Sequence, residues 1–157
     1  MCKNKFKELI LMTLLGFTVF VIVYVLEGKL KLFGLRLNLS ETDINNLHLA
    51  LNENRWLFIG VVTLYMLLVN TIEELIYRYI PYKIIVLKLR KPYWMCGILT
   101  SMVFAFVHNL FGLTGLPIPQ FLLGLVLWWV IKRGYLSALT VHLSYNLPII
   151  LTLFLSK

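Results

Sequence analysis

One stretch of the chain decides its class, and it reads Trp56-Leu-Phe-Ile-Gly-Val-Val-Thr-Leu-Tyr-Met-Leu-Leu-Val-Asn70-Thr-Ile-Glu73-Glu74-Leu-Ile-Tyr-Arg78. Most of this stretch is apolar enough for a membrane span, yet it ends in two adjacent glutamates and an arginine. An acidic side chain at the centre of a bilayer helix costs roughly 2.5–3.5 kcal/mol on insertion scales. Ionisable groups retained in such a segment therefore indicate a functional site.

The composition of the whole chain is that of an integral membrane protein. Its 157 residues are 60% hydrophobic and only 14% charged, whereas an ordinary soluble domain is about 45–50% apolar. The length predicts a single membrane domain over residues 1–157. The net charge is +8, but the 15 Lys and Arg are scattered between apolar runs and form no basic face. We therefore expect the lipid bilayer as a partner, and no nucleic acid.

Apolar runs separated by charges and helix breakers predict an all-α bundle of about five transmembrane helices. A short amphipathic helix at the membrane interface is expected to start near residues 40–43, and residues 112–119 are typical of a tight turn. The first apolar run lacks a cleavage site and is interpreted as an uncleaved helix. The five helices are expected at residues 9–26, 56 to about 88, 94–110, 120–131 and 135–155.

Basic residues predict that the N-terminus lies inside, because the inner loops then hold more positive charge than the outer ones. Trp128 and Trp129 are expected in an aromatic belt at the interface. The high usage of Asn, Ile and Lys favours a bacterial source for this cell-membrane protein. The predicted inner loops carry Lys3, Lys5, Lys7, Lys83, Lys88, Arg90, Lys91, Lys132 and Arg133.

The depth of each polar residue in the membrane can be calculated from the rise of a helix per residue, and these depths predict that polar groups of different helices meet. If the second helix runs through Pro81 to about residue 88, Glu73 lies ~22 Å from the inner boundary. His108 then lies at ~21 Å, and His142 and Asn146 lie at ~10 and ~16 Å. Tilting brings these levels together. We expect Glu73, His108 and His142 to converge on one water-accessible pocket within the lipid layer.

The spacing of the polar residues in the second helix predicts which of them share a helix face. Glu74 and Arg78 are four residues apart, so they share a face and can pair. Asn70 lies one turn before Glu74 on the same stripe. Glu73 points about 100° away and is free to face another helix.

Three motifs together make the chain resemble the CPBP family, the CAAX proteases and bacteriocin-processing (Abi) enzymes. Each motif is short, but all three occur in the family's order inside apolar segments. The resemblance covers about residues 60–150, which would form the catalytic core. The motifs read Glu73-Glu74-Leu-Ile-Tyr-Arg78, Phe104-Ala-Phe-Val-His108 and His142-Leu-Ser-Tyr-Asn146.

The resemblance implies an intramembrane endopeptidase, a hydrolase whose substrate is a peptide or protein. By this analogy Glu73, helped by His108, would activate a water for attack on a peptide carbonyl. Asn146 and His142 would stabilise the oxyanion that forms. A role in peptide maturation or bacteriocin self-immunity would fit a bacterial member of the family.

The resemblance also implies a structural ion pair between Glu74 and Arg78. It leaves open whether zinc takes part; if so, Glu73, His108 and His142 would form its two-histidine, one-carboxylate ligand set. No other cofactor is implied.

A second hypothesis is a non-catalytic membrane protein that kept the motif geometry. It would bind a bacteriocin or a partner membrane protein and sequester it. A proton or ion carrier is disfavoured, because the sequence shows neither repeats nor paired broken helices.

Overall fold

All regular elements in the described chain are helices. The computed structural model describes residues 2–31, 41–110 and 118–155, with side chains described at 5–25, 54–108, 118–148 and 151. No strand occurs in these ranges, which confirms the all-α prediction. The elements are α1 (Cys2–Lys31), α2 (Glu41–Glu74), the π-helical segments η1 (Leu75–Tyr79) and η2 (Tyr82–Lys88), α3 (Tyr93–Leu110), α4 (Ile118–Ile131) and α5 (Tyr135–Leu155).

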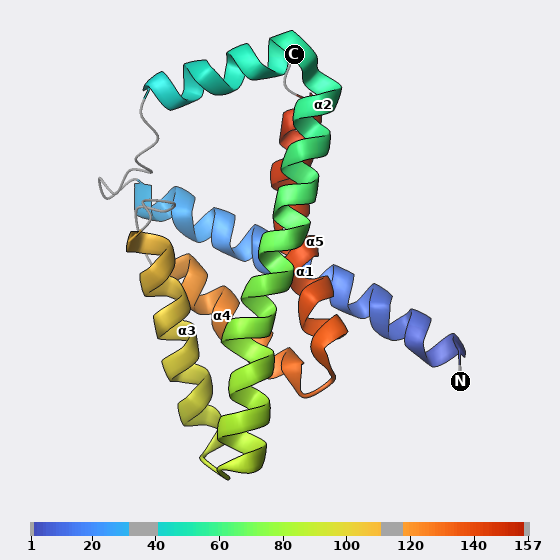
Figure 1. Cartoon of the computed structure of the whole chain (residues 1–157), viewed down its shortest axis with the longest axis vertical. Helices are drawn as coiled ribbons and strands as arrows, with labels where there is room; N and C mark the ends of the chain where they lie inside the picture. The colour runs from blue at the N-terminus through green and yellow to red at the C-terminus, as the bar shows by residue number, and fades with distance from the viewer. Residues whose placement is uncertain (1, 32–40, 111–117, 156–157) are drawn as a thin grey trace.

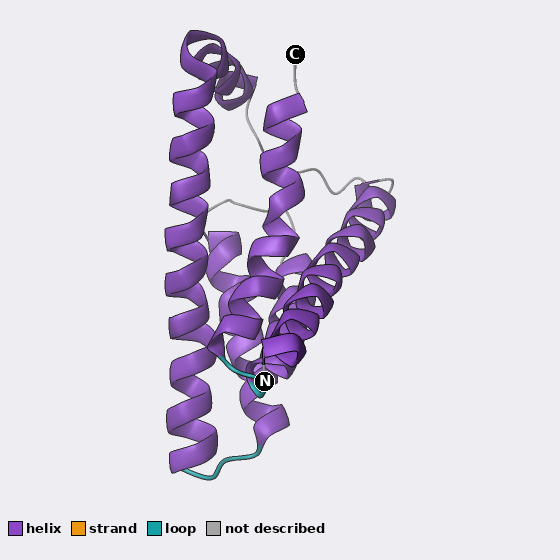
Figure 2. Ribbon diagram, turned by 90° about the vertical axis from the view of Figure 1, so that its right-hand side faces the viewer, coloured by secondary structure: helices purple, strands orange, loops and turns teal. Residues whose placement is uncertain are grey.

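The helices form a bundle around α5. The long helix α2 stands along α5, and α1 crosses behind them obliquely (Figure 1). α3 packs against α4, and α4 in turn contacts α5. The turned view shows the steep tilt of α1 relative to the long axis of α2 (Figure 2). This arrangement lets α2, α3 and α5 present side chains to one another.

α2 changes direction at Asn54, whose backbone is non-helical (φ −152°, ψ 76°). The side-chain oxygen of Asn54 accepts a hydrogen bond from the backbone N–H of Leu57 at 3.3 Å, as an N-cap does. The portion before Asn54 lies across the direction of the rest of α2 (Figure 1). This break corresponds to the expected boundary between a short first helix and a long second one. Most of the turn expected at residues 112–119 lies outside the described residues.

The long helix continues past Arg78 to Lys88, as the depth argument required. It does so by π-type hydrogen bonds around Pro81: the N–H of Ile80 donates to Leu75 O, and that of Leu89 donates to Ile84 O at 2.9 Å. π-Helical turns widen a helix locally and occur often at functional sites. Here they directly follow the two glutamates.

An apolar core joins α1, α4 and α5. Its members are buried and come from these three helices only, so this core fixes α5 against α1 and α4. They are Met12, Val19, Val23, Leu123, Leu127, Val130, Ile131, Ala138 and Val141.

Along α2 and η1 most buried side chains are polar, with Ile59 the apolar exception among the described residues, and the exposed side chains are largely apolar. Asn70, Glu74 and Arg78 are 3%, 0% and 0% exposed, while Leu64 and Leu68 are 57% and 54% exposed. Segments 5–25 and 54–88 are long and apolar enough to cross a membrane by length and composition. Apolar surface on this scale requires a lipid or protein cover.

Small residues set the closest helix contacts. A Cβ at Gly16 of α1 would lie 2.5 Å from the backbone oxygen of Val141, so α1 crosses α5 at this glycine. A Cβ at Gly124 would lie 2.9 Å from Cβ of Ser101, which marks the contact of α4 with α3. Close backbone approach at such residues is typical of helices packed in membranes.

The prediction that Trp128 belongs to an interfacial belt is wrong. Trp128 is only 3% exposed, its indole N–H donates to Tyr93 O at 3.0 Å, and its ring fills the space beside Gly97. Trp129 is 55% exposed. The two neighbours differ because they point to different faces of α4, and the face of Trp128 packs on α3.

Candidate active site

The carboxylate of Glu73 lies between two imidazoles. Its Oε1 is 3.4 Å from His108 Nε2, and its Oε2 is 3.7 Å from His142 Nε2. The three side chains come from α2, α3 and α5 and are 18%, 16% and 4% exposed. Tertiary packing therefore brings together the three groups that the sequence pattern singled out.

Each imidazole has its other nitrogen engaged. His108 Nδ1 lies 2.9 Å from the backbone oxygen of Phe104, and His142 Nδ1 lies 2.9 Å from Oε1 of Glu74. A carbonyl or carboxylate oxygen only accepts, so Nδ1 carries the hydrogen in both rings. When a ring is neutral, its Nε2 can accept a hydrogen bond from Glu73 in the protonated form of that carboxyl group. The two rings are thus held in one tautomer and one orientation.

Glu74 and Arg78 form the buried pair expected from their spacing. Arg78 Nη1 lies 3.9 Å from Glu74 Oε1, and both side chains are fully buried. None of the guanidinium nitrogens has a hydrogen-bond partner among the described residues. The cation instead stacks on the ring of Phe104, with Cζ 4.0 Å from the centroid. Charge and stacking together hold Arg78 inside.

Phe104 connects the ion pair to the imidazoles. Its ring centroid is 4.2 Å from that of His108 and 6.1 Å from that of His142. The residue is 1% exposed. Phe104 therefore fixes the distance between the site and the buried cation.

The two asparagines meet across the α2–α5 contact. Asn146 Nδ2 donates to Oδ1 of Asn70 at 3.0 Å. Asn146 follows His142 by one helical turn, and Asn70 precedes Glu74 by one turn. The stripe of α2 that pairs with Arg78 thus also reaches Asn146.

These groups line a cavity of about 220 Å³. Glu73, His108, His142 and Asn146 all face it. Gln120 of α4 faces it too, and its Oε1 is buried with no hydrogen-bond partner among the described residues. Our sequence interpretation missed Gln120. Its one available signal was a lone amide in the otherwise apolar α4.

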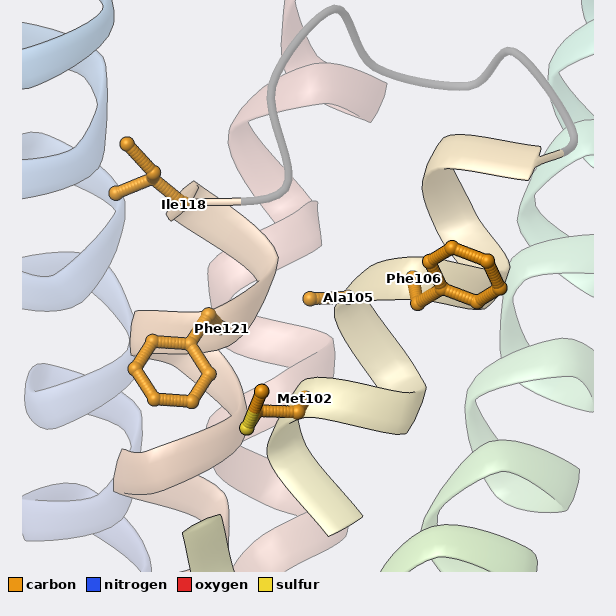
Figure 3. A pocket seen from close by; sticks show the side chains of 5 residues that line it. All are labelled: Met102, Ala105, Phe106, Ile118 and Phe121. Carbon is orange, nitrogen blue, oxygen red and sulfur yellow. The ribbon is translucent and has the colours of Figure 1, made fainter. Parts of the chain in front are cut away.

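A larger apolar groove lies between α3 and α4. It has a volume of about 360 Å³, and Met102 and Ala105 of α3 line it together with Ile118 and Phe121 of α4 (Figure 3). It shares no lining residue with the cavity around Glu73.

The donors around Glu73 are of the types that zinc accepts, and both imidazoles have the engaged Nδ1 typical of ligating histidines. Even so, no group of three or more His, Cys, Asp or Glu within the described chain is arranged to hold a metal ion. The ligand set suggested by the sequence, Glu73, His108 and His142, does not have that arrangement here.

A family model for type II CAAX prenyl endopeptidases, Rce1-like, matches residues 55–148. No curated protein and no solved structure gives a significant match to the chain. The matched region contains the two glutamates, both histidines of the cavity and Asn146.

Proposed function

Since the chain belongs to the type II CAAX prenyl endopeptidase Rce1-like family, we propose that it is a polytopic intramembrane endopeptidase whose catalytic groups are Glu73, His108, His142 and Asn146. The observation that carries the proposal is the position of Glu73, 3.4 Å and 3.7 Å from two imidazoles in a shared cavity. A carboxyl group and imidazoles at this range can act as a general acid–base set.

The membrane part of the proposal rests on the many exposed apolar side chains of the helices and on the buried polar stripe of α2 and η1. Members of this family are membrane proteins, and the lipid would cover the apolar outer faces of α2 and its neighbours. We assign about five spans, with the N-terminus inside. Near the proposed inner end, Lys132 lies 3.7 Å from the centroid of the Tyr93 ring, and Arg133 lies 5.2 Å from that of Trp129. Such cation–aromatic pairs suit an interface with anionic headgroups.

In the proposed reaction, Glu73 takes a proton from a water whose oxygen attacks the peptide carbonyl carbon. Once Glu73 holds that proton, its O–H donates to Nε2 of His108, and this bond orients the carboxyl group. The carbonyl oxygen becomes an oxyanion and accepts a hydrogen bond from Nδ2 of Asn146. When the C–N bond breaks, the proton held by Glu73 passes to the leaving nitrogen. The products are a carboxylic acid and an amine.

The second glutamate supports the first. Glu74 accepts the Nδ1–H of His142 and thereby turns Nε2 of that ring towards Glu73. A carboxylate behind an imidazole fixes its tautomer and stabilises it when it is protonated. Glu74 is fully buried, so we assign it to this orienting role and to Arg78, not to contact with substrate.

We place the biological role in peptide maturation or bacteriocin self-immunity in a bacterial membrane, with a peptide or protein as substrate. The competing role, sequestering a bacteriocin without cleavage, uses the same surface but not the carboxylate. Immunity or maturation compared among wild type, Glu73→Ala and His108→Ala at equal expression separates the two. Equal function in all three would support sequestration.

The direct test uses the purified full-length chain in phosphatidylcholine vesicles with a synthetic peptide library. Mass spectrometry of new termini measures cleavage. We expect cleavage by wild type and a loss of about 10²–10⁴-fold for Glu73→Gln. Glu8→Gln is the matched control, because the Glu8 carboxylate accepts a hydrogen bond from Ser137 and lies outside the cavity. No cleavage by wild type, or equal cleavage by both variants, would refute the proposal.

A further inference from the structure

Asn70 is a buried polar side chain that the proposed reaction does not use. It is 3% exposed, and its Oδ1 accepts the hydrogen bond from Asn146 at 3.0 Å. Its own Nδ2 is buried and has no hydrogen-bond partner among the described residues. A buried amide donor without a partner lowers the stability of the fold. Such a group therefore calls for an explanation, and a ligand acceptor supplies one.

Asn70 also stands between two hollows. The cavity around Glu73 has a volume of about 220 Å³, and a second hollow of about 230 Å³ lies between α2 and α5. Met66, Asn70 and Asn146 line both of them. The two hollows therefore adjoin at the asparagine pair.

Their sizes indicate how a peptide would lie. Neither hollow reaches the ~300 Å³ at the lower end of ordinary ligand sites. The second hollow adjoins the first at the asparagine pair, so it offers room for a peptide attacked at Glu73 to extend past that pair. Its polar lining groups are the two asparagine amides and the hydroxyls of Thr63 and Ser144.

The two N–H groups of Asn146 have different surroundings. One is donated to Asn70 Oδ1, and this bond fixes the plane of the amide. The other N–H of the same nitrogen then has a set direction. Asn70 thus sets the orientation of the Asn146 N–H that is proposed to donate to the oxyanion. A donor that is already oriented stabilises an oxyanion most effectively.

We propose that Asn70 is a further residue of the site: its Oδ1 positions the Asn146 amide, and its Nδ2 donates to a backbone carbonyl of the peptide substrate. This inference rests on the proposed endopeptidase function. The first role acts through Asn146 and predicts an effect on kcat. The second role is a substrate contact and predicts an effect on KM.

The test is a double-mutant cycle in Asn70→Leu, Asn146→Ala and the double variant. The probe is one peptide that wild type cleaves, chosen from the synthetic library, and the full chain is used in vesicles. In the wild-type background we expect Asn70→Leu to lower kcat about tenfold, because loss of one hydrogen bond has an effect of about this size. In the Asn146→Ala background the same change should leave kcat nearly unaltered, because no amide remains to be aimed. KM should rise in both backgrounds.

Thr18→Val is the matched control, because Thr18 lines neither hollow and its hydroxyl donates to the backbone oxygen of Leu14 in its own helix. Its kcat and KM should match wild type. Thermal unfolding of each variant in detergent separates these effects from misfolding, and Asn70→Ala provides a second replacement if the leucine variant is unstable. Equal losses of kcat in both backgrounds would overturn the positioning role, and an unchanged KM would overturn the substrate contact. Absence of wild-type cleavage would instead refute the endopeptidase function itself.

Discussion

Glu74 Oε1 lies 2.9 Å from Nδ1 of His142 and 3.9 Å from Nη1 of Arg78. One buried carboxylate oxygen therefore faces both a cation of its own helix and an imidazole of α5. Spacing in the sequence predicted only the contact with Arg78. The contact with His142 links the structural pair to the proposed catalytic groups.

The ion pair should be a major source of stability. Glu74→Gln keeps the shape and leaves an oxygen that can accept from His142, but it leaves the Arg78 charge uncompensated. Breaking a buried pair in this way costs about 3–5 kcal/mol. We expect the free energy of unfolding in detergent to fall by that amount. In Glu74→Gln/Arg78→Met part of the loss should return, and a double variant less stable than the single one would contradict this explanation.

The aromatic ring of Phe104 should contribute to the stability of the fold. Phe104→Leu preserves an apolar side chain but removes the face on which the Arg78 guanidinium stacks at 4.0 Å. A desolvated cation–π contact contributes about 2 kcal/mol, so the unfolding free energy should fall by at least this much. Phe106→Leu on the same helix is the control, because Phe106 is 60% exposed. Equal losses in the two variants would show that the stacking contributes nothing.

The crossing of α1 and α5 should be sensitive to one methyl group. Gly16→Ala would place Cβ 2.5 Å from the backbone oxygen of Val141, and a backbone atom cannot rotate away. Overpacking of this kind costs about 1–3 kcal/mol. Gly60→Ala meets nothing within 4 Å and should be neutral or slightly stabilising, since Ala favours helix over Gly. Thermal unfolding of both variants measures the difference, and a stable Gly16→Ala would mean that α1 does not cross there.

Asn146 should affect turnover more than binding. Asn146→Ala removes the N–H proposed to donate to the oxyanion, and loss of one such donor lowers kcat about 10²–10³-fold. KM should change little, because the oxyanion exists only in the transition state. Steady-state kinetics on a library-derived peptide measures both constants. A variant with normal kcat and raised KM would assign Asn146 to substrate binding instead.

The local features of this chain could be predicted from its sequence. Asn70, Glu74 and Arg78 share one stripe because they are spaced at four residues, and the structure buries that stripe. The continuation of the helix past Pro81 was also predicted, from the membrane depth that Glu73 needs in order to meet His108. The extent of α5 was also predicted, since the apolar run from residue 135 to 155 has a clear start after Gly134.

Contacts between helices could not be predicted in the same way. Nothing in the sequence indicated that His142 bonds to Glu74 or that Asn70 bonds to Asn146, and the lone amide of Gln120 gave no indication of which neighbour it faces. Trp128 was placed at the membrane interface because a Trp pair at a helix end is typical there, but tertiary packing against Gly97 buries its ring. Such contacts depend on which face each helix turns to its neighbour.

The sequence alone determined which polar groups enter apolar helices and which of them share a face, because helical periodicity is a local property of the chain. Only the tertiary structure decided which nitrogen of each imidazole turns to which carboxylate and which amides meet. That choice follows from crossings such as the one at Gly16, where the absence of a side chain lets two backbones touch. Helix crossings are set by the packing of residues far apart in the chain, and no periodicity encodes them.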